Sequence, residues 1–155
     1  MANSSHPLQT AAQVAQSHED AAVKALAESQ KRLAEQQSRF QQMQQFRGEY
    51  AAQFQTEGLN GISARRFQDY AVFLNNLDHG ITQLQRQLDR LRQDLCQHQR
   101  AWGQMHAKTK ALEEVIKRDR KEQVRKEDYR EQQDSDERNL RSTASQKNWV
   151  DGEGA

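Results

Sequence analysis

A heptad repeat in the middle of the chain constrains the fold more than any other feature. Between residues 67 and 116, two series of positions spaced seven apart carry apolar or aromatic side chains, with Thr109 and His98 as the exceptions. Such positions are the a and d sites of a coiled coil, and their average spacing of about 3.5 residues predicts a left-handed supercoil. The a series is Phe67, Leu74, Ile81, Leu88, Leu95, Trp102, Thr109 and Ile116, and the d series is Tyr70, Leu77, Leu84, Leu91, His98, Met105 and Leu112.

A second and weaker repeat precedes the first. Polar residues interrupt it at Ser29, Gln36 and Arg47, and towards the N-terminus it fades through Glu19 and two alanines to Leu8. A polar residue at such a position lowers stability but restricts the register of the helix pair. The apolar members are Leu26, Leu33, Phe40 and Phe54 at a, with Ala22, Met43 and Tyr50 at d.

A turn signal separates the two repeats. Residues 57–63 contain Gly58 and the pair Asn60-Gly61, which adopts positive φ readily, and Ser63 is suited to cap a following helix. The sequence therefore predicts two helices, over about 8–56 and 64–116, that fold back on each other. The expected fold class is all-α, an antiparallel two-helix coiled-coil hairpin.

Two registers satisfy the antiparallel geometry, because each a position faces a d position of the partner helix. Paired residue numbers then sum to either 117 or 124. The first register is preferred here, since it places Glu19 opposite His98 and Arg47 opposite Tyr70.

Beyond Ile116 the apolar pattern ends and charges segregate along the chain. Residues 117–126 hold six basic and two acidic residues, and residues 127–137 hold six acidic residues and one basic residue. Intrahelical charge pairs predict that helix continues here without a partner. The expected organisation is a disordered N-terminus over 1–7, a helical coiled coil over 8–138 whose helix is unpaired after about 116, and a disordered tail over 139–155.

Composition excludes several functions. The 155 residues are 34% hydrophobic and 29% charged, and the mean hydropathy of −1.15 is too low for a chain that encloses a deep apolar pocket. The five histidines and the single Cys96 form no metal-binding or nucleophilic pattern, so we expect neither an enzyme nor a cofactor. A formal net charge of +1 argues against general nucleic-acid binding, and no apolar stretch resembles a signal peptide or membrane span. A single cysteine fits a reducing cytoplasm.

Two aromatic residues lie beside the heptad positions. Phe46 and Phe73 both occupy g, one residue before an a position, and should meet because the g positions of antiparallel helices lie on the same side. Gly80, also at g, would expose backbone beside them. This stripe either thickens the core or forms a docking surface.

The chain resembles the flagellar export protein family FliJ in three segments. These are Phe46-Arg47-Gly48-Glu49-Tyr50, the turn Leu59-Asn60-Gly61-Ile62-Ser63, and the aromatic-rich start of the second helix, Phe67-Gln68-Asp69-Tyr70-Ala71-Val72-Phe73-Leu74. The resemblance covers about residues 40–90.

This resemblance implies a non-enzymatic cytoplasmic component of the flagellar type III export apparatus, peripherally associated with the inner membrane. Its implied partners are the hexameric export ATPase, bound like the stalk of a rotary ATPase, the cytoplasmic domain of the export-gate membrane protein, and export chaperones. It would act as a monomer. The gate-facing residues implied by position are Arg39, Met43, Phe46, Tyr50, Phe73, Leu77, Gly80 and Leu84.

The basic run after the hairpin is a candidate contact with the ATPase ring, or alternatively a solvated helix face. Its residues are Lys117, Arg118, Arg120, Lys121, Arg125 and Lys126. Two other functions stay open at this point. One is the stalk of a virulence type III secretion system, and the other is a generic coiled-coil scaffold that dimerises through its a and d positions.

Overall fold

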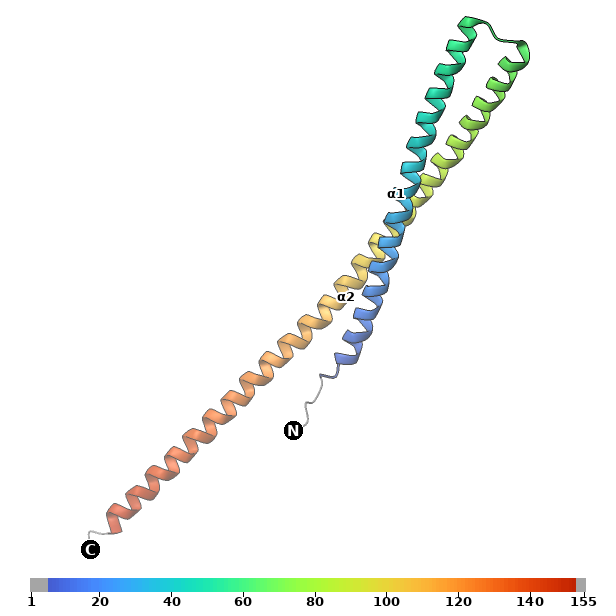
Figure 1. Ribbon diagram of the computed structural model, residues 1–155. Coiled ribbons are helices and arrows are strands. Elements are labelled where there is room, and N and C mark those ends of the chain that lie inside the picture. Colours follow the sequence, from blue (N-terminus) through green and yellow to red (C-terminus); the bar gives the residue numbers. More distant parts are fainter. Residues whose placement is uncertain (1–5, 153–155) are drawn as a thin grey trace. The chain divides into compact units, whose positions relative to one another are not determined.

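The protein consists of two antiparallel helices joined by a short turn. The computed structural model describes residues 6–152, in which α1 spans Gln9–Asn60 and α2 spans Ala64–Gly152 (Figure 1). The all-α hairpin predicted from the heptad repeats is confirmed. Two compact units can be distinguished: the hairpin unit, residues 14–108, and the terminal unit, to which the described residues 6–13 and 109–152 belong.

The hairpin unit is held together by the predicted a and d residues of both helices. Tyr70, Leu84 and Leu88 are the most enclosed side chains that α2 contributes to this unit, with Leu88 only 2% exposed. The facing side of α1 is more polar, since Ser29 is buried and, among the described residues, no hydrogen-bond partner reaches its hydroxyl. A buried hydroxyl without a partner costs stability, which is the expected effect of an interrupted heptad.

The register differs from the one preferred on sequence grounds. Phe54 packs against Tyr70 with ring centroids 5.1 Å apart, a pair whose numbers sum to 124. Arg47 binds Asp78 rather than facing Tyr70, with Nε 2.9 Å from the carboxylate, and Glu19 hydrogen-bonds to His106 at 2.6 Å rather than facing His98. The expectation of a sum of 117 was therefore wrong. Arg47 and Glu19 of α1 instead bind residues at e positions of α2. Each e position directly follows a d position, and the preferred register had predicted partners at d.

The turn is tighter than predicted. α1 continues through Gly58 to Asn60, so that residues 61–63 alone are non-helical, whereas residues 57–63 were expected to form the turn. Gly61 has a φ of 84°, the conformation that glycine adopts without strain. Ser63 caps α2 as expected, because its Oγ accepts a hydrogen bond from the Arg66 amide at 3.2 Å.

The terminal unit joins the start of the chain to the middle of α2. Ala12, Thr109 and Ile116 are buried, and His6 Nε2 donates to Asp119 Oδ2 at 2.8 Å. The other ring nitrogen of His6 accepts from the Leu8 amide, which assigns the ring proton to Nε2. The paired region therefore ends just beyond Ile116, as the heptad pattern predicts.

Beyond this contact α2 has no buried side chain among the described residues. Residues 121–149 are all exposed, and the helix continues to Gly152. The sequence analysis expected a disordered tail over 139–155, but residues 139–152 are helical in the structure. Good helix formers such as Leu140 and Ala144 occur there, and neither proline nor glycine interrupts the segment before Gly152.

Part of the predicted disorder lies outside the described residues, namely 1–5 and 153–155. His6 and Pro7, which were included in the expected disordered N-terminus, belong to the terminal unit through the His6–Asp119 contact.

Candidate partner-binding surfaces

An aromatic cluster occupies one side of the hairpin unit near the turn. Phe46 and Phe73 meet edge to face, with ring centroids 6.2 Å apart, which confirms that the two g positions lie together. Tyr50 lies between them, 4.5 Å from the Phe73 ring and 6.2 Å from the Phe46 ring. These separations are in the range that aromatic pairs favour. We call Phe46, Tyr50 and Phe73 the aromatic cluster.

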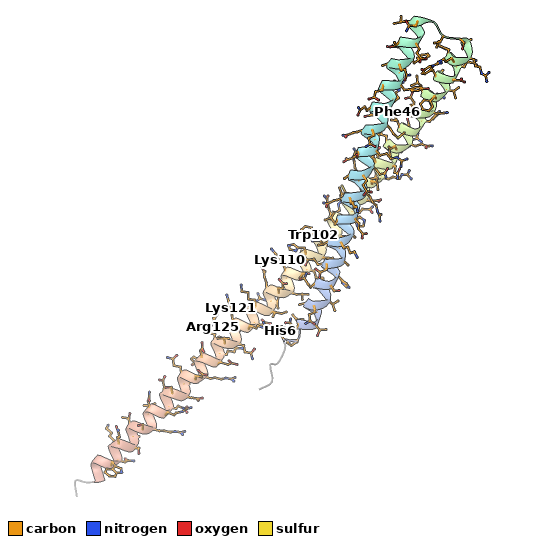
Figure 2. All side chains as sticks on the ribbon, viewed as in Figure 1. His6, Phe46, Trp102, Lys110, Lys121 and Arg125 are labelled. Atoms are coloured by element: carbon orange, nitrogen blue, oxygen red, sulfur yellow. The ribbon has the colours of Figure 1, made fainter. Side chains whose placement is uncertain are left out.

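The cluster is only partly covered by the rest of the protein. Phe46 is 48% exposed and Phe73 is 37% exposed, whereas Tyr70, on the same helix as Phe73, is 5% exposed. Figure 2 shows the Phe46 side chain on α1 near the turn end of the hairpin unit. Each of the two phenylalanines therefore presents a large apolar area to solvent while remaining positioned by its ring neighbours. A rigid and exposed aromatic surface is characteristic of protein–protein contacts.

A small residue adjoins this cluster on α2. At Gly80, an added Cβ would lie 3.1 Å from the terminal methyl of Met43, so glycine allows the methionine side chain to rest against the α2 backbone. Met43 itself is half-buried. Together they extend the apolar surface along the helix pair away from the turn.

The structure separates the eight predicted gate-facing residues into three groups. Five of them make the contacts described above, which join Phe46, Tyr50 and Phe73 to one another and Met43 to Gly80. Leu77 is half-buried and Arg39 is exposed. Leu84 is only 6% exposed, so its side chain belongs to the core and offers little surface to a partner.

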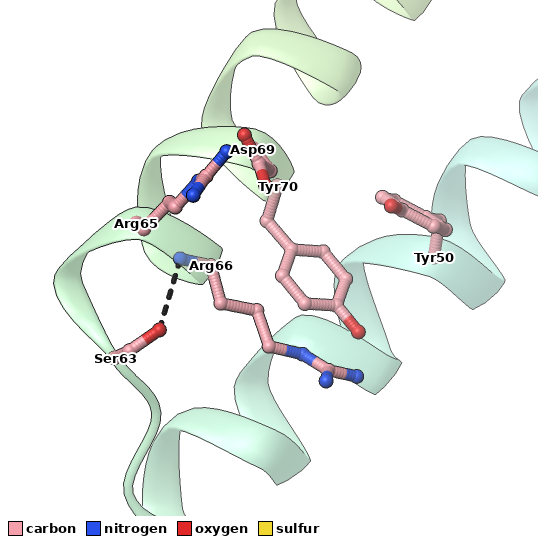
Figure 3. Close-up of a pocket in the computed structure, with 6 residues that line it drawn as sticks. All are labelled: Tyr50, Ser63, Arg65, Arg66, Asp69 and Tyr70. Atoms are coloured by element: carbon pink, nitrogen blue, oxygen red, sulfur yellow. Dashed lines mark hydrogen bonds between the residues drawn. The ribbon is translucent and has the colours of Figure 1, made fainter.

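Beside the cluster lies a shallow polar pocket that sequence reasoning missed. It is lined by residues of the α2 start and by Tyr50 of α1, as Figure 3 shows. Arg66 binds the Glu57 carboxylate across the turn through two hydrogen bonds of 2.9 and 3.0 Å. The residues that line the pocket are Tyr50, Ser63, Arg65, Arg66, Asp69 and Tyr70.

Tyr70 and Glu57 perturb each other at the edge of this pocket. Donation by the Tyr70 hydroxyl lowers the pKa of Glu57, and the Arg66 guanidinium lowers it further, against an opposing effect of burial. The same hydrogen bond raises the pKa of Tyr70. The arrangement ties the two sides of the turn together with charge-assisted bonds. A signal for it existed in the sequence, since Glu57 and Arg66 flank the turn at similar distances from Gly61.

The predicted basic run lies on the exposed part of α2. All six of its basic side chains are exposed, and Lys121 and Arg125 are labelled in Figure 2. Arg120 reaches Gln9 of α1 at 3.4 Å, and Lys126 lies 3.9 Å from Glu122 within the same helix. The structure thus places these residues in the terminal unit, where the aromatic cluster has no member.

Comparison with known proteins identifies the family. A sequence model described as "Flagellar FliJ protein" matches residues 4–148, which is nearly the whole chain. The chain belongs to the FliJ family. No curated protein and no solved structure matches the chain.

Membership in the FliJ family makes this chain a non-catalytic component of the flagellar export apparatus. The match extends well beyond residues 40–90, where the resemblance was first recognised, and it takes in the basic run. It also favours the flagellar system over the virulence system and the generic scaffold that composition left open.

Two kinds of feature are absent from the described part of this FliJ-family chain. Within residues 6–152, no three histidine, cysteine, aspartate or glutamate side chains gather as a metal site would require. In the same span, neither helix has a stretch long and apolar enough to cross a membrane.

Proposed function

We propose that this chain is an adaptor of the flagellar export apparatus with two separate contact regions. The aromatic cluster and its neighbours dock on the cytoplasmic domain of the export-gate membrane protein. The basic run of α2 binds the hexameric export ATPase, in the manner of the stalk of a rotary ATPase. Export chaperones are further partners, and the protein works peripherally at the cytoplasmic side of the inner membrane.

The observation that carries the gate proposal is the exposure of Phe46 and Phe73 in a cluster built from both helices. Aromatic side chains at the centre of an interface contribute much of its binding energy, especially where they are held rigidly before binding. Here ring contacts with Tyr50 hold them. The remaining predicted gate residues, Arg39, Met43, Leu77 and Gly80, would surround the cluster, while Leu84 would support it from the core.

The support for ATPase binding is electrostatic. Exposed positive side chains on a helix attract acidic surfaces and speed association, and this attraction weakens with salt. A single helix without buried side chains, residues 121–149, is also narrow enough to enter a ring. Binding the ATPase subunits unequally would shift their conformations without any chemistry from this chain.

The double substitution Phe46→Ala with Phe73→Ala tests the gate contact. We expect gate affinity to fall by about a hundredfold, as for the loss of two central aromatic anchors. Isothermal titration calorimetry with the purified gate domain measures this change. The melting temperature should fall only modestly, because both rings are already partly exposed.

Val14→Ala with Val23→Ala is the matched control, since both valines are exposed on α1 outside the cluster. It should leave gate affinity unchanged. Gate binding that survives in the double phenylalanine variant would remove the aromatic cluster from the interface.

The ATPase contact is tested separately by adding saturating amounts of the chain to the purified ATPase. Hydrolysis and ring assembly should both change, and the change should diminish when Arg120 and Lys126 are replaced by Glu. If neither the turnover nor the oligomeric state of the ATPase changes when the chain is added, the stalk role is ruled out.

A further inference from the structure

One face of the exposed part of α2 carries charges that are sorted by sign. Residues three and four apart lie on the same face of a helix. From residue 117 to 125 this face bears basic charges alone, and from 128 to 136 it bears acidic charges alone. Its members in order are Lys117, Arg118, Lys121, Arg125, Asp128, Gln132, Ser135 and Asp136, and we call them the sorted face.

The other side of the same segment is mixed in sign. Asp119, Lys126, Glu127, Arg130 and Asp134 follow one another there without segregation. If the charges served only to form ion pairs within the helix, both signs would be expected on every side. Glu122 and Lys126 form such an intrahelical pair. The segregation is therefore a property of one face and not of the segment as a whole.

The sorted face is available to a partner. The start of the chain packs against the opposite side of α2, where Ile116 is buried and Asp119 binds His6. At roughly 100° per residue, the sorted face lies about half a turn away from that contact. Its side chains are all exposed, and within residues 6–149 none of its charged groups forms an ion pair.

The pattern is complementary to itself when one copy is reversed. If two such helices lie antiparallel with their centres between residues 126 and 127, Lys117 faces Asp136 and Arg125 faces Asp128, and each pair occurs twice by symmetry. Val124 and Tyr129, the two large apolar side chains of the segment, border the face on its two edges and are 55% and 63% exposed. A parallel alignment would place like charges together, which opposes association.

We propose that the sorted face binds a second copy of this chain, antiparallel and centred between residues 126 and 127. A partner of uniform charge would match only half of the face, whereas a second copy matches both halves. The hairpin itself still forms within one chain, so this dimer adds to the fold expected of a monomer and does not replace it. The proposal does not depend on ATPase binding.

Sedimentation equilibrium of the full chain tests the proposal without any other protein. A series reaching about 0.5 mM is appropriate, because exposed ion pairs are individually weak. We expect a monomer–dimer equilibrium whose dissociation constant rises by about tenfold or more between about 50 mM and about 500 mM salt, as screening removes the attraction.

Charge reversal then identifies the face. Replacing Lys117, Arg118, Lys121 and Arg125 together by Glu makes both halves acidic, and Asp128→Lys with Asp136→Lys makes both halves basic. Each variant alone should be monomeric, while an equimolar mixture should form a heterodimer. Circular dichroism confirms that each remains helical. Arg86→Glu with Arg90→Glu, on the exposed side of the hairpin unit, is the control and should dimerise like the wild type.

Two results would overturn the proposal. One is a wild-type chain that stays monomeric over the whole series at low salt. The other is a failure of the charge-reversal test: either variant alone still dimerises, or the mixture of the two variants does not associate. Each of these outcomes would mean that the dimer contact lies elsewhere on the chain.

Discussion

At the scale of single residues, the turn end of the hairpin unit is stabilised by polar contacts that supplement a thin core. Glu57 joins Tyr70 and Arg66 across the turn, and Arg47 joins Asp78 between the helices. These contacts lie at the surface or at its edge, where ion pairs are modest in strength. Their effect is to fix which residues of the two helices face each other.

Acid should weaken the hairpin partly through Glu57. Because the folded protein lowers the pKa of Glu57 below its ordinary value of 4.5, the carboxylate stabilises the fold above that pH. This stabilisation is lost as the pH falls through the lower, folded value. The difference in melting temperature between the wild type and Glu57→Gln should therefore be largest near neutral pH and shrink as the pH is lowered below 4.5.

Glu28→Gln is the control, since Glu28 is exposed on α1. Its melting temperature at neutral pH should differ less from that of the wild type. If the difference in melting temperature between the wild type and Glu57→Gln stayed constant down to about pH 3, ionisation of the Glu57 carboxylate would not be what stabilises the fold.

Two glycines allow helix propensity to be separated from packing. Gly48→Ala meets no atom within 4 Å and should stabilise the protein by about 1 kcal/mol. Gly80→Ala brings a methyl group to 3.1 Å from the flexible end of Met43, which must shift slightly. We therefore expect Gly80→Ala to stabilise the protein by less than Gly48→Ala. Urea denaturation measures both, and a Gly80→Ala protein less stable than the wild type would mean that Met43 cannot move.

At the scale of the helices, the heptad repeat predicts the fold but not the alignment. Period alone indicates which side of each helix is buried, and the turn residues indicate where the chain reverses. Both registers bury the same a and d residues, so the apolar pattern does not distinguish them. The choice depended on Arg47 and Glu19, whose partners Asp78 and His106 stand outside the a and d series.

The candidate surface was predictable for a related reason. That Phe46 and Phe73 lie on the same side of the helix pair follows from their shared g position, which requires no knowledge of the register. Leu84 was assigned to the gate-facing surface, although its d position already predicted burial. The Tyr70–Glu57–Arg66 contacts depend on the exact path of the turn, which no sequence period describes.

The core of the hairpin unit should be sensitive to truncation at its most enclosed residue. Leu88→Ala removes a side chain that is 2% exposed and should cost about 2–5 kcal/mol. Leu140→Ala makes the same chemical change on α2 at a residue that is 70% exposed, and should cost no more than about 0.5 kcal/mol. Chemical denaturation of the two variants compares them directly. Equal losses would contradict the assignment of the core to the heptad positions.

At the scale of the whole molecule, burial is confined to part of the chain. The described residues after Arg120 contribute no buried side chain, although they make up a substantial part of α2. The stability of the fold therefore depends little on these residues, which leaves them available for the contacts proposed above. Export-apparatus components of this family have no catalytic centre to maintain, so an exposed helix can be devoted to contacts.

Removing residues 121–155 tests this division. The melting temperature of the shortened chain should stay within a few degrees of the wild type, because no buried contact among the described residues is lost. Its helical signal should fall by about a quarter, in proportion to the helical residues removed. Circular dichroism records both quantities. A large drop in melting temperature would show that the removed segment contributes to the folded core.

The two tryptophans of the chain fall in different units, and this has a practical consequence. Trp102 stacks on His106 in the hairpin unit with ring centroids 5.0 Å apart, while Trp149 is 73% exposed near the end of α2. With Trp149→Phe, the remaining indole becomes an intrinsic fluorophore for the pairing of the helices. With Trp102→Phe, the emission instead reports the solvent surroundings of the distal helix, and an anionic quencher separates the two signals in the native protein.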